Sequence, residues 1–204
     1  MNEFLINLSK EIEFCGDIRR DVYNLLIKYN RPRIAEHTLR VGNKAKALAA
    51  TFGVDEDLAE IAGLLHDIGG IFPYDERVEI AKKLNIEVLP EEEMAPIILH
   101  QKISKVMAEE IFKIKDTRVL EAIACHTTLK ANASTMDMII FIADKLEWDQ
   151  TGIPPYLSEV EEQLKKSLEL GAFTFLKYQW DNRANLMVIH PWLEEAYKDL
   201  KEKI

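Results

Sequence analysis

The sequence predicts an all-α protein, and three observations support this fold class. Apolar residues recur at steps of three and four along almost the whole chain, which is the spacing of one face of a helix. Residues that begin or end helices, such as Pro32 and Gly53, stand at the borders of these periodic segments. The sequence has neither two alternating runs joined by a hairpin turn nor a glycine-rich phosphate loop after a strand.

The clearest single helix is predicted over residues 32 to 52. Pro32 suits its first turn, where no backbone N–H is needed, and Gly53 suits the left-handed position that ends many helices. The core-facing positions of this segment follow one another at steps of four and three: Ile34, Thr38, Val41, Ala45, Leu48 and Phe52.

A second helix is expected to follow, with Asp55 as its N-cap residue. We expect Gly69-Gly70 to end this helix, because glycine is the residue that most often ends one. The pair His66-Asp67 would then lie at the C-terminal end of the helix.

Further helices are predicted from the same signals. Pro96 opens a helical segment, and a shorter helix is expected to end near His126. The apolar positions of the two are Leu99, Ile103, Met107 and Ile111 in the first, and Val119, Leu120 and Ile123 in the second.

Ser134 and Asp137 form a predicted capping box ahead of the apolar run that leads to Asp144. The sequence Thr-Gly-Ile-Pro-Pro at 151–155 is the strongest break in the chain, and two or three more helices are expected after it. His190, which precedes Pro191, is expected at the start of the last helix in a structural role.

Composition limits the classes of function. The chain has 204 residues, of which 48% are hydrophobic, and a net charge of −9, which argues against general nucleic-acid binding. Two cysteines are too few for a disulfide scaffold, and we interpret Cys125 as a small core side chain. The first residues, Met1 to Phe4, lack the basic start and apolar stretch that are typical of a signal peptide, and the longest apolar run, 138–143, is far shorter than the ~20 residues of a membrane span. The expected location is the cytoplasm.

Four of the five histidines and two aspartates fall at helical positions, in the order His37, His66, Asp67, His100, His126 and Asp144. For any one histidine, a hydrogen-bonded core position is the simpler interpretation, and Asp144 could instead pair with Lys145. The joint pattern favours a metal site, because a buried, unpaired carboxylate at Asp144 would cost several kcal/mol that a cation would remove. Imidazole and carboxylate ligands without thiolate suit Fe, Mn, Co, Ni or Zn.

The order of these six residues resembles that of the HD-domain superfamily of metal-dependent phosphohydrolases. The resemblance covers about 32–150 and implies an HD-type helical bundle, with the metal core in this range and a C-terminal helical extension over about 155–204, all within one domain of residues 1–204. It implies two metal ions, with Fe as the first choice. One ion would be held by His37, His66, Asp67 and Asp144, and the other by Asp67 as a bridge with His100 and His126. Asp67 and His66 would be the residues on which turnover depends.

Within the superfamily, three segments look most like the YqeK family: residues 126–128 (HTT), 141–147 (FIADKLE) and 188–191 (VIHP). Its members are symmetrical bis(5′-nucleosyl)-tetraphosphatases, which split diadenosine tetraphosphate into two ADP, and some are fused to a nicotinate mononucleotide adenylyltransferase. The family usually has Lys where this chain has Gly70, and Gly-Arg where it has Leu129-Lys130. The expected substrate is a nucleotide or dinucleoside polyphosphate, hydrolysed by metal-activated water.

Five side chains are candidate substrate contacts: Arg33, Arg40, Lys102, Lys130 and Trp148. The four cations lie close in sequence to the predicted ligands, although most such side chains are simply solvated. Trp148 follows Asp144 by four residues and could stack a nucleobase or fill the core.

Two other functions fit the same ligands. An HD-type di-iron oxygenase would use all six to activate dioxygen, and a regulatory module would keep metals and nucleotide binding without turnover. A homodimer is one option for assembly, and neither nucleic acid nor a membrane is an expected partner.

Overall fold

The computed structural model describes residues 2–148 and 150–204. Over these residues every regular element is an α-helix or a short 3₁₀ helix, so the all-α prediction is confirmed. No helix in the described part of the chain is both long enough and apolar enough to cross a membrane.

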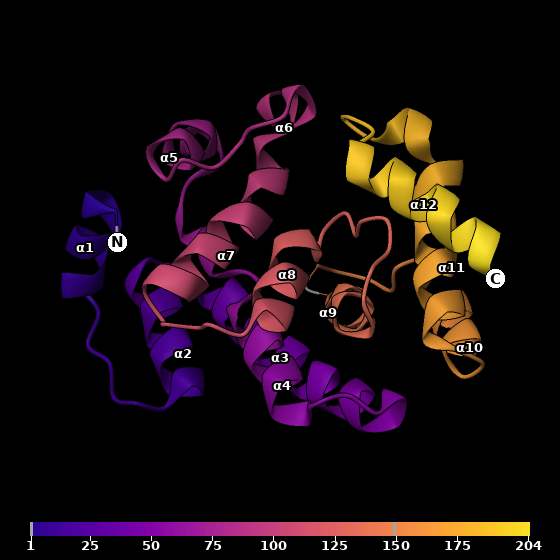
Figure 1. Cartoon of the computed structure of the whole chain (residues 1–204), viewed down its shortest axis with the longest axis horizontal. Coiled ribbons are helices and arrows are strands. Elements are labelled where there is room, and N and C mark those ends of the chain that lie inside the picture. The colour runs from indigo at the N-terminus through magenta and orange to yellow at the C-terminus, as the bar shows by residue number, and fades with distance from the viewer. Residues whose placement is uncertain (1, 149) are drawn as a thin grey trace.

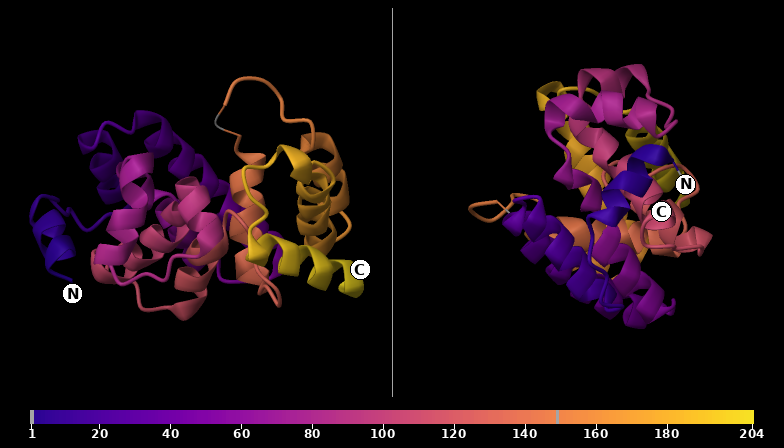
Figure 2. Two further views of the ribbon diagram at one scale, coloured as in Figure 1. Left: turned by 90° about the horizontal axis from the view of Figure 1, so that it is seen from above. Right: turned by 90° about the vertical axis from the view of Figure 1, so that its left-hand side faces the viewer.

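The first part of the chain forms α1 (Glu3–Lys10), α2 (Ile18–Lys28), α3 (Pro32–Phe52), α4 (Glu56–Leu65), η1 (Ile68–Ile71), η2 (Tyr74–Glu76), α5 (Arg77–Lys83) and α6 (Pro90–Met94). The second part forms η3 (Pro96–Leu99), α7 (His100–Glu110), α8 (Thr117–Cys125), α9 (Thr135–Leu146), α10 (Leu157–Leu164), α11 (Leu168–Asp181), η4 (Arg183–Asn185) and α12 (Pro191–Lys203). Helices α3, α4, α7, α8 and α9 lie together in the middle of the molecule, with α10–α12 at one end and α1 at the other (Figures 1 and 2).

The boundaries of α3 agree with the sequence prediction. Pro32 opens the helix, and Gly53 ends it with φ 71°, in the left-handed region that favours glycine. The Asp55 side chain caps α4 by accepting hydrogen bonds from the backbone N–H groups of Asp57 and Leu58. The capping residues alone were therefore enough to predict both ends of α3 and the start of α4.

The predicted end of the second helix is wrong, because α4 ends at Leu65 and Gly69-Gly70 lie inside η1. Close packing explains the first glycine. A Cβ on Gly69 would lie 2.6 Å from the carbonyl oxygen of His100. The Gly69 N–H donates to Ser104 Oγ at 2.9 Å, so glycine permits the close approach of η1 to α7.

The later elements follow the prediction with one difference. Pro96 opens the 3₁₀ helix η3, and the α-helical part α7 starts only at His100. The capping box of Ser134 and Asp137 is present at the start of α9, and three α-helices follow the break at 151–155.

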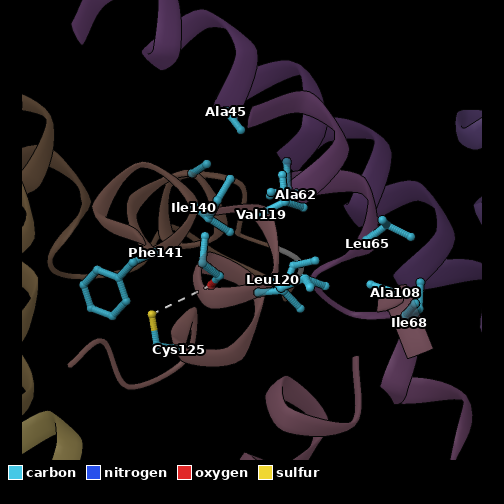
Figure 3. Packing of buried hydrophobic residues seen from close by; sticks show 14 of the residues in the cluster. Ala45, Ala62, Leu65, Ile68, Ala108, Val119, Leu120, Cys125, Ile140 and Phe141 are labelled. Carbon is cyan, nitrogen blue, oxygen red and sulfur yellow. Dashed lines mark hydrogen bonds between the residues drawn. The ribbon is translucent and has the colours of Figure 1, made fainter. Parts of the chain in front are cut away.

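The core packs the central helices closely. Ala45 of α3, Ala62 of α4, Val119 of α8 and Ile140 of α9 are fully buried and lie near one another in Figure 3. Small residues allow this approach, since a Cβ on Gly63 would lie 2.8 Å from the Cα of Gly42. Helices α3 and α4 are thus held in a fixed relation, as are the predicted metal ligands that they carry.

Candidate metal centre

All six predicted ligands lie together in one cluster of side chains. At one end is Asp144 of α9, whose Oδ1 is 2.9 Å from His37 Nε2 and 3.6 Å from His66 Nε2. His66 Nε2 also lies 3.7 Å from Asp67 Oδ2, so its ring stands between the two carboxylates.

At the other end, Asp67 faces two further histidines. Its Oδ1 is 3.0 Å from His100 Nε2 and 3.5 Å from His126 Nε2. Ligand atoms within 4.8 Å of one another form three sets that could each hold a metal ion, and Asp67 belongs to two of them. The sets are His37, His66 and Asp67; His66, His126 and Asp144; and Asp67, His100 and His126.

Three of the histidines sit at helix ends and are oriented in the same way. His66 and His126 follow the last residues of α4 and α8, and His100 is the first residue of α7. In each, Nδ1 bonds the carbonyl oxygen three residues earlier, at 2.6 Å for His66 and 2.8 Å for His126. This bond leaves Nε2 to point into the cluster, as metal-binding imidazoles require.

These hydrogen bonds also determine where the proton of each ring lies. A carbonyl oxygen only accepts, so Nδ1 carries the hydrogen and Nε2 of the neutral ring carries a lone pair. The Nε2 atoms of His100 and His126 are 2.9 Å apart, and burial lowers the pKa of His126 to about 4. His66 Nε2 is buried and has no hydrogen-bond partner among the described residues. Lone pairs that converge in this way fit a bound cation.

Both carboxylates are held in the charged form that a metal ion needs. Burial favours the neutral acid, but in the absence of a metal the positive charge of the nearby His66 and His100 rings, when they are protonated, holds the pKa of Asp67 well below its ordinary value. Burial likewise opposes the charge of Asp144, yet Lys145 and the hydrogen bond with His37 keep its pKa well below the usual range. The donor set therefore fits metal binding.

A cavity of about 460 Å³ opens beside the Asp144 end of the cluster. His37, Thr127, Asp144 and Lys145 line it on the metal side. The rest of the wall comes from the segment between α9 and α10, from α11 and from the turn around η4, and it includes Trp148, Tyr156, Phe175, Tyr178, Gln179, Asn182 and Asn185. The ring centroids of Trp148 and Tyr156 are 6.2 Å apart in an edge-to-face arrangement.

Residues 34–149 match the family model of the HD domain. The chain belongs to the HD domain family. The match covers the six clustered ligands, so the predicted superfamily is confirmed.

Relatives of this HD protein support the same family. It is 43% identical over 151 residues to an uncharacterised protein in the pepC 5′ region of Lactococcus lactis subsp. cremoris, across 74% of this chain and 76% of that protein. It is 32% identical over 134 residues to the symmetrical bis(5′-nucleosyl)-tetraphosphatase of Halalkalibacterium halodurans, across 65% of this chain and 70% of that enzyme.

The fold is similar to a crystal structure of a predicted HD superfamily hydrolase involved in NAD metabolism from Clostridium acetobutylicum. The TM-score is 0.83 at 25% sequence identity, across 91% of this chain and 97% of that one. The HD protein is therefore a hydrolase of a metal-dependent family, as the sequence predicted.

Of the five candidate substrate contacts in the HD protein, Trp148 lies in the wall of the cavity. The four cations are absent from the described residues that line it. Arg33 is exposed, and Arg40 Nε lies 3.4 Å from Glu147. The other two are held in ion pairs away from the cavity: Lys102 of α7 with Glu92 at 2.8 Å, and Lys130, beyond the end of α8, with Glu121 at 2.9 Å.

Other residues of the site were not predicted. Buried Gln101 accepts a hydrogen bond from Thr127 N–H at 3.0 Å and donates to Thr128 Oγ1 at 3.3 Å, which fixes the turn after His126. Thr127 Oγ1 in turn lies 3.3 Å from His100 Nε2. The signal available in the sequence was a glutamine that directly follows the predicted ligand His100 in a helix with an apolar face.

The polar face of α11 was also missed. Tyr178 and Asn182 are four residues apart, and Gln179 lies between them on the cavity side. Their uncharged polar and aromatic character differs from the charged pairs that mark a solvated helix face, and this difference was the available signal.

Two residues predicted to be structural take that role. His190 caps α12 by accepting a hydrogen bond from Trp192 N–H, and its Nε2 lies 3.3 Å from Glu92. Cys125 is fully buried in the core (Figure 3).

Proposed function

We propose that this HD protein hydrolyses a nucleotide or dinucleoside polyphosphate, with cleavage of diadenosine tetraphosphate into ADP as the first reaction to test. The observation that carries the proposal is the position of the six-residue cluster, which opens at Asp144 and His37 into the aromatic-lined cavity. The volume of about 460 Å³ falls within the roughly 300–1,000 Å³ of small-molecule sites.

Two metal ions are part of this proposal. One would be held by His37, His66, Asp67 and Asp144, and the second by Asp67, His100 and His126. Iron is the first choice, with Mn, Co, Ni and Zn as alternatives that suit the same imidazole and carboxylate ligands. Ions bound in such a site lower the pKa of water and neutralise charge on phosphoryl oxygens.

The protein itself would position the substrate. The rings of Trp148 and Tyr178 offer aromatic surface to a nucleobase, and the amides of Gln179 and Asn182 offer donors and acceptors to its polar edge. Lys145 Nζ donates to Asp144 Oδ2 at 2.5 Å and also lines the cavity. This ammonium group would meet a phosphate that lies between the cavity and the metal ligands.

The C-terminal helices belong to this proposed site. Because α11 supplies one wall of the cavity and α9 carries Asp144, we treat residues 1–204 as one HD-type domain whose extension helps to bind substrate.

The test combines metal analysis with a product assay. Protein purified with and without oxygen is analysed for metals and then incubated with diadenosine tetraphosphate, mononucleotides and other dinucleoside polyphosphates. We expect about two metal ions per chain and oxygen-independent formation of ADP. Asp67→Asn should lose metal and turnover, whereas Asp116→Asn, at a partly exposed aspartate that pairs with Arg118, should lose neither.

Two results would favour the other functions. Oxygen consumption coupled to an organic substrate, without phosphate release, would indicate a di-iron oxygenase. Tight nucleotide binding without product under every metal tried would indicate a regulatory module.

A further inference from the structure

Two arginines outside the described cavity approach the loop that follows Asp67. Arg31, directly before α3, donates from Nε to the carbonyl oxygen of Gly70 at 2.9 Å and from Nη2 to that of Ile71 at 3.3 Å. Arg77, the first residue of α5, donates from Nε to the carbonyl oxygen of Phe72 at 3.2 Å. Both guanidinium groups thus bind the same three-residue stretch, 70–72, which lies three to five residues after Asp67.

Arg77 also shares a hydrogen-bond acceptor with His100, a predicted metal ligand. Its Nη1 donates to the carbonyl oxygen of Ile97 at 3.0 Å, and His100 Nδ1 bonds the same oxygen. A single carbonyl group therefore separates the Arg77 guanidinium from the His100 ring. This places the arginine at the Asp67–His100 end of the cluster, whereas the cavity opens at the Asp144 end.

The charge of this pair is not balanced by an ion pair. Neither Arg31 nor Arg77 lies within ion-pairing distance of a carboxylate among the described residues, although the chain has 35 acidic and 26 basic side chains. Burial and the charge of Arg31 lower the pKa of Arg77, against the effect of Asp67. Two half-buried guanidinium groups, close enough to act on each other, are costly unless an anion joins them.

Donor groups remain for such an anion. A guanidinium has five N–H donors, and each arginine gives two of its donor contacts to the carbonyl groups named above. The remaining donors have the forked geometry that matches phosphate oxygens.

We propose that Arg31 and Arg77 form an anion subsite that binds the part of a polyphosphate chain lying beyond the Asp67–His100 end of the metal centre. The identity of the anion rests on the proposed function. Symmetrical cleavage leaves a phosphate pair on each side of the broken bond, so each side of the centre needs a cationic contact. Lys145 would contact the phosphates on the cavity side of the metal centre, and Arg31 and Arg77 would contact those on the opposite side.

The subsite is tested by titrating inorganic tripolyphosphate into the metal-loaded protein by calorimetry. Hydrogen bonds to a charged group contribute about 1.5–3 kcal/mol, so Arg31→Gln and Arg77→Gln should each weaken binding roughly 10- to 100-fold. The matched control is Arg118→Gln, because this exposed arginine pairs with Asp116 at 2.6 Å and should bind as tightly as wild type. Unchanged binding by both glutamine variants, at full metal content, would overturn the subsite.

If a glutamine variant loses metal, lysine variants provide the test of the anion subsite. Arg31→Lys and Arg77→Lys keep the charge but lose the forked donors, so binding several-fold weaker than wild type at full metal content supports the subsite. Equal binding refutes it. The result is separate from the proposed function: a wild-type protein that cleaves no dinucleotide still reports on tripolyphosphate binding, and an active enzyme with unaffected variants refutes the subsite alone.

Discussion

Glu92 of α6 links α7 to the start of α12, so its substitution tests how much this contact with the C-terminal helices contributes to stability. Its side chain is fully buried, with its carboxylate 2.8 Å from Lys102 Nζ and 3.3 Å from His190 Nε2. It also accepts a hydrogen bond from Leu89 N–H at 2.9 Å, at the start of α6. Glu92→Ala would leave the Lys102 side chain, which is only 12% exposed, without its counter-ion.

Removing one partner of a buried pair costs about 3–5 kcal/mol in the free energy of unfolding. In a chain of 204 residues each kcal/mol lowers Tm by about 2–4 °C, so Glu92→Ala should lower Tm by about 6–20 °C. The assay is urea and thermal unfolding followed by circular dichroism, with metal content held equal.

Glu93→Ala is the matched control. Glu93 is the next residue and pairs with Lys82 at 3.0 Å, but both side chains are more than half exposed, so the loss should stay below about 1 kcal/mol. The double variant Glu92→Leu with Lys102→Met removes both charges and should recover most of the stability. If Glu92→Ala unfolds within about 1 kcal/mol of Glu93→Ala, the buried pair does not have the role assigned to it.

The pH dependence of this difference has a definite sign. Burial opposes the charge of Glu92, but the hydrogen bonds from His190, Leu89 N–H and Lys102 outweigh it and lower the pKa of Glu92 from its ordinary 4.5. A carboxylate whose pKa is lower in the folded state stabilises the fold above the unfolded-state pKa and ceases to do so as the pH falls through the folded-state pKa. The stability gap between wild type and Glu92→Ala should therefore be complete above about pH 5 and shrink below it.

Three further predictions concern the site and the core. Asp67→Asn should lose metal, as measured by elemental analysis, because Asp67 faces three imidazoles, and two ions per chain in this variant would contradict the assignment. Trp148→Leu should raise KM for the proposed substrate roughly tenfold at unchanged kcat, since one stacked base is worth about 1–3 kcal/mol, and an unchanged KM would exclude this contact. One thiol, that of exposed Cys15, should react with a maleimide in the native protein, because burial raises the pKa of Cys125, and fast reaction of two thiols would show an open core.

The six residues predicted to be metal ligands cluster in the structure, whereas four of the five predicted substrate contacts lie outside the cavity wall, and helix geometry explains the difference. Lys102 follows His100 by two residues, a rotation of about 200° on a helix, so the two side chains point in opposite directions. Lys130 follows His126 by four residues, but α8 has ended and Leu129 turns the chain with φ 58°. Arg40 is near the His37 face of α3 and instead reaches Glu147.

The clustering of the predicted ligands could be anticipated because the groups that orient them are local in sequence. The histidines at 66, 100 and 126 are oriented by carbonyl groups three residues earlier, so each helix end supplies both the ligand and the group that orients it. The residues of the cavity wall could not be predicted in this way, because α9 and α11 are separate in sequence and come together only in the folded protein. We therefore expect substitutions on α11 to change the preferred substrate while the helix ends that orient these imidazoles stay intact. Binding assays on variants of Gln179 and Asn182 would separate substrate choice from metal binding.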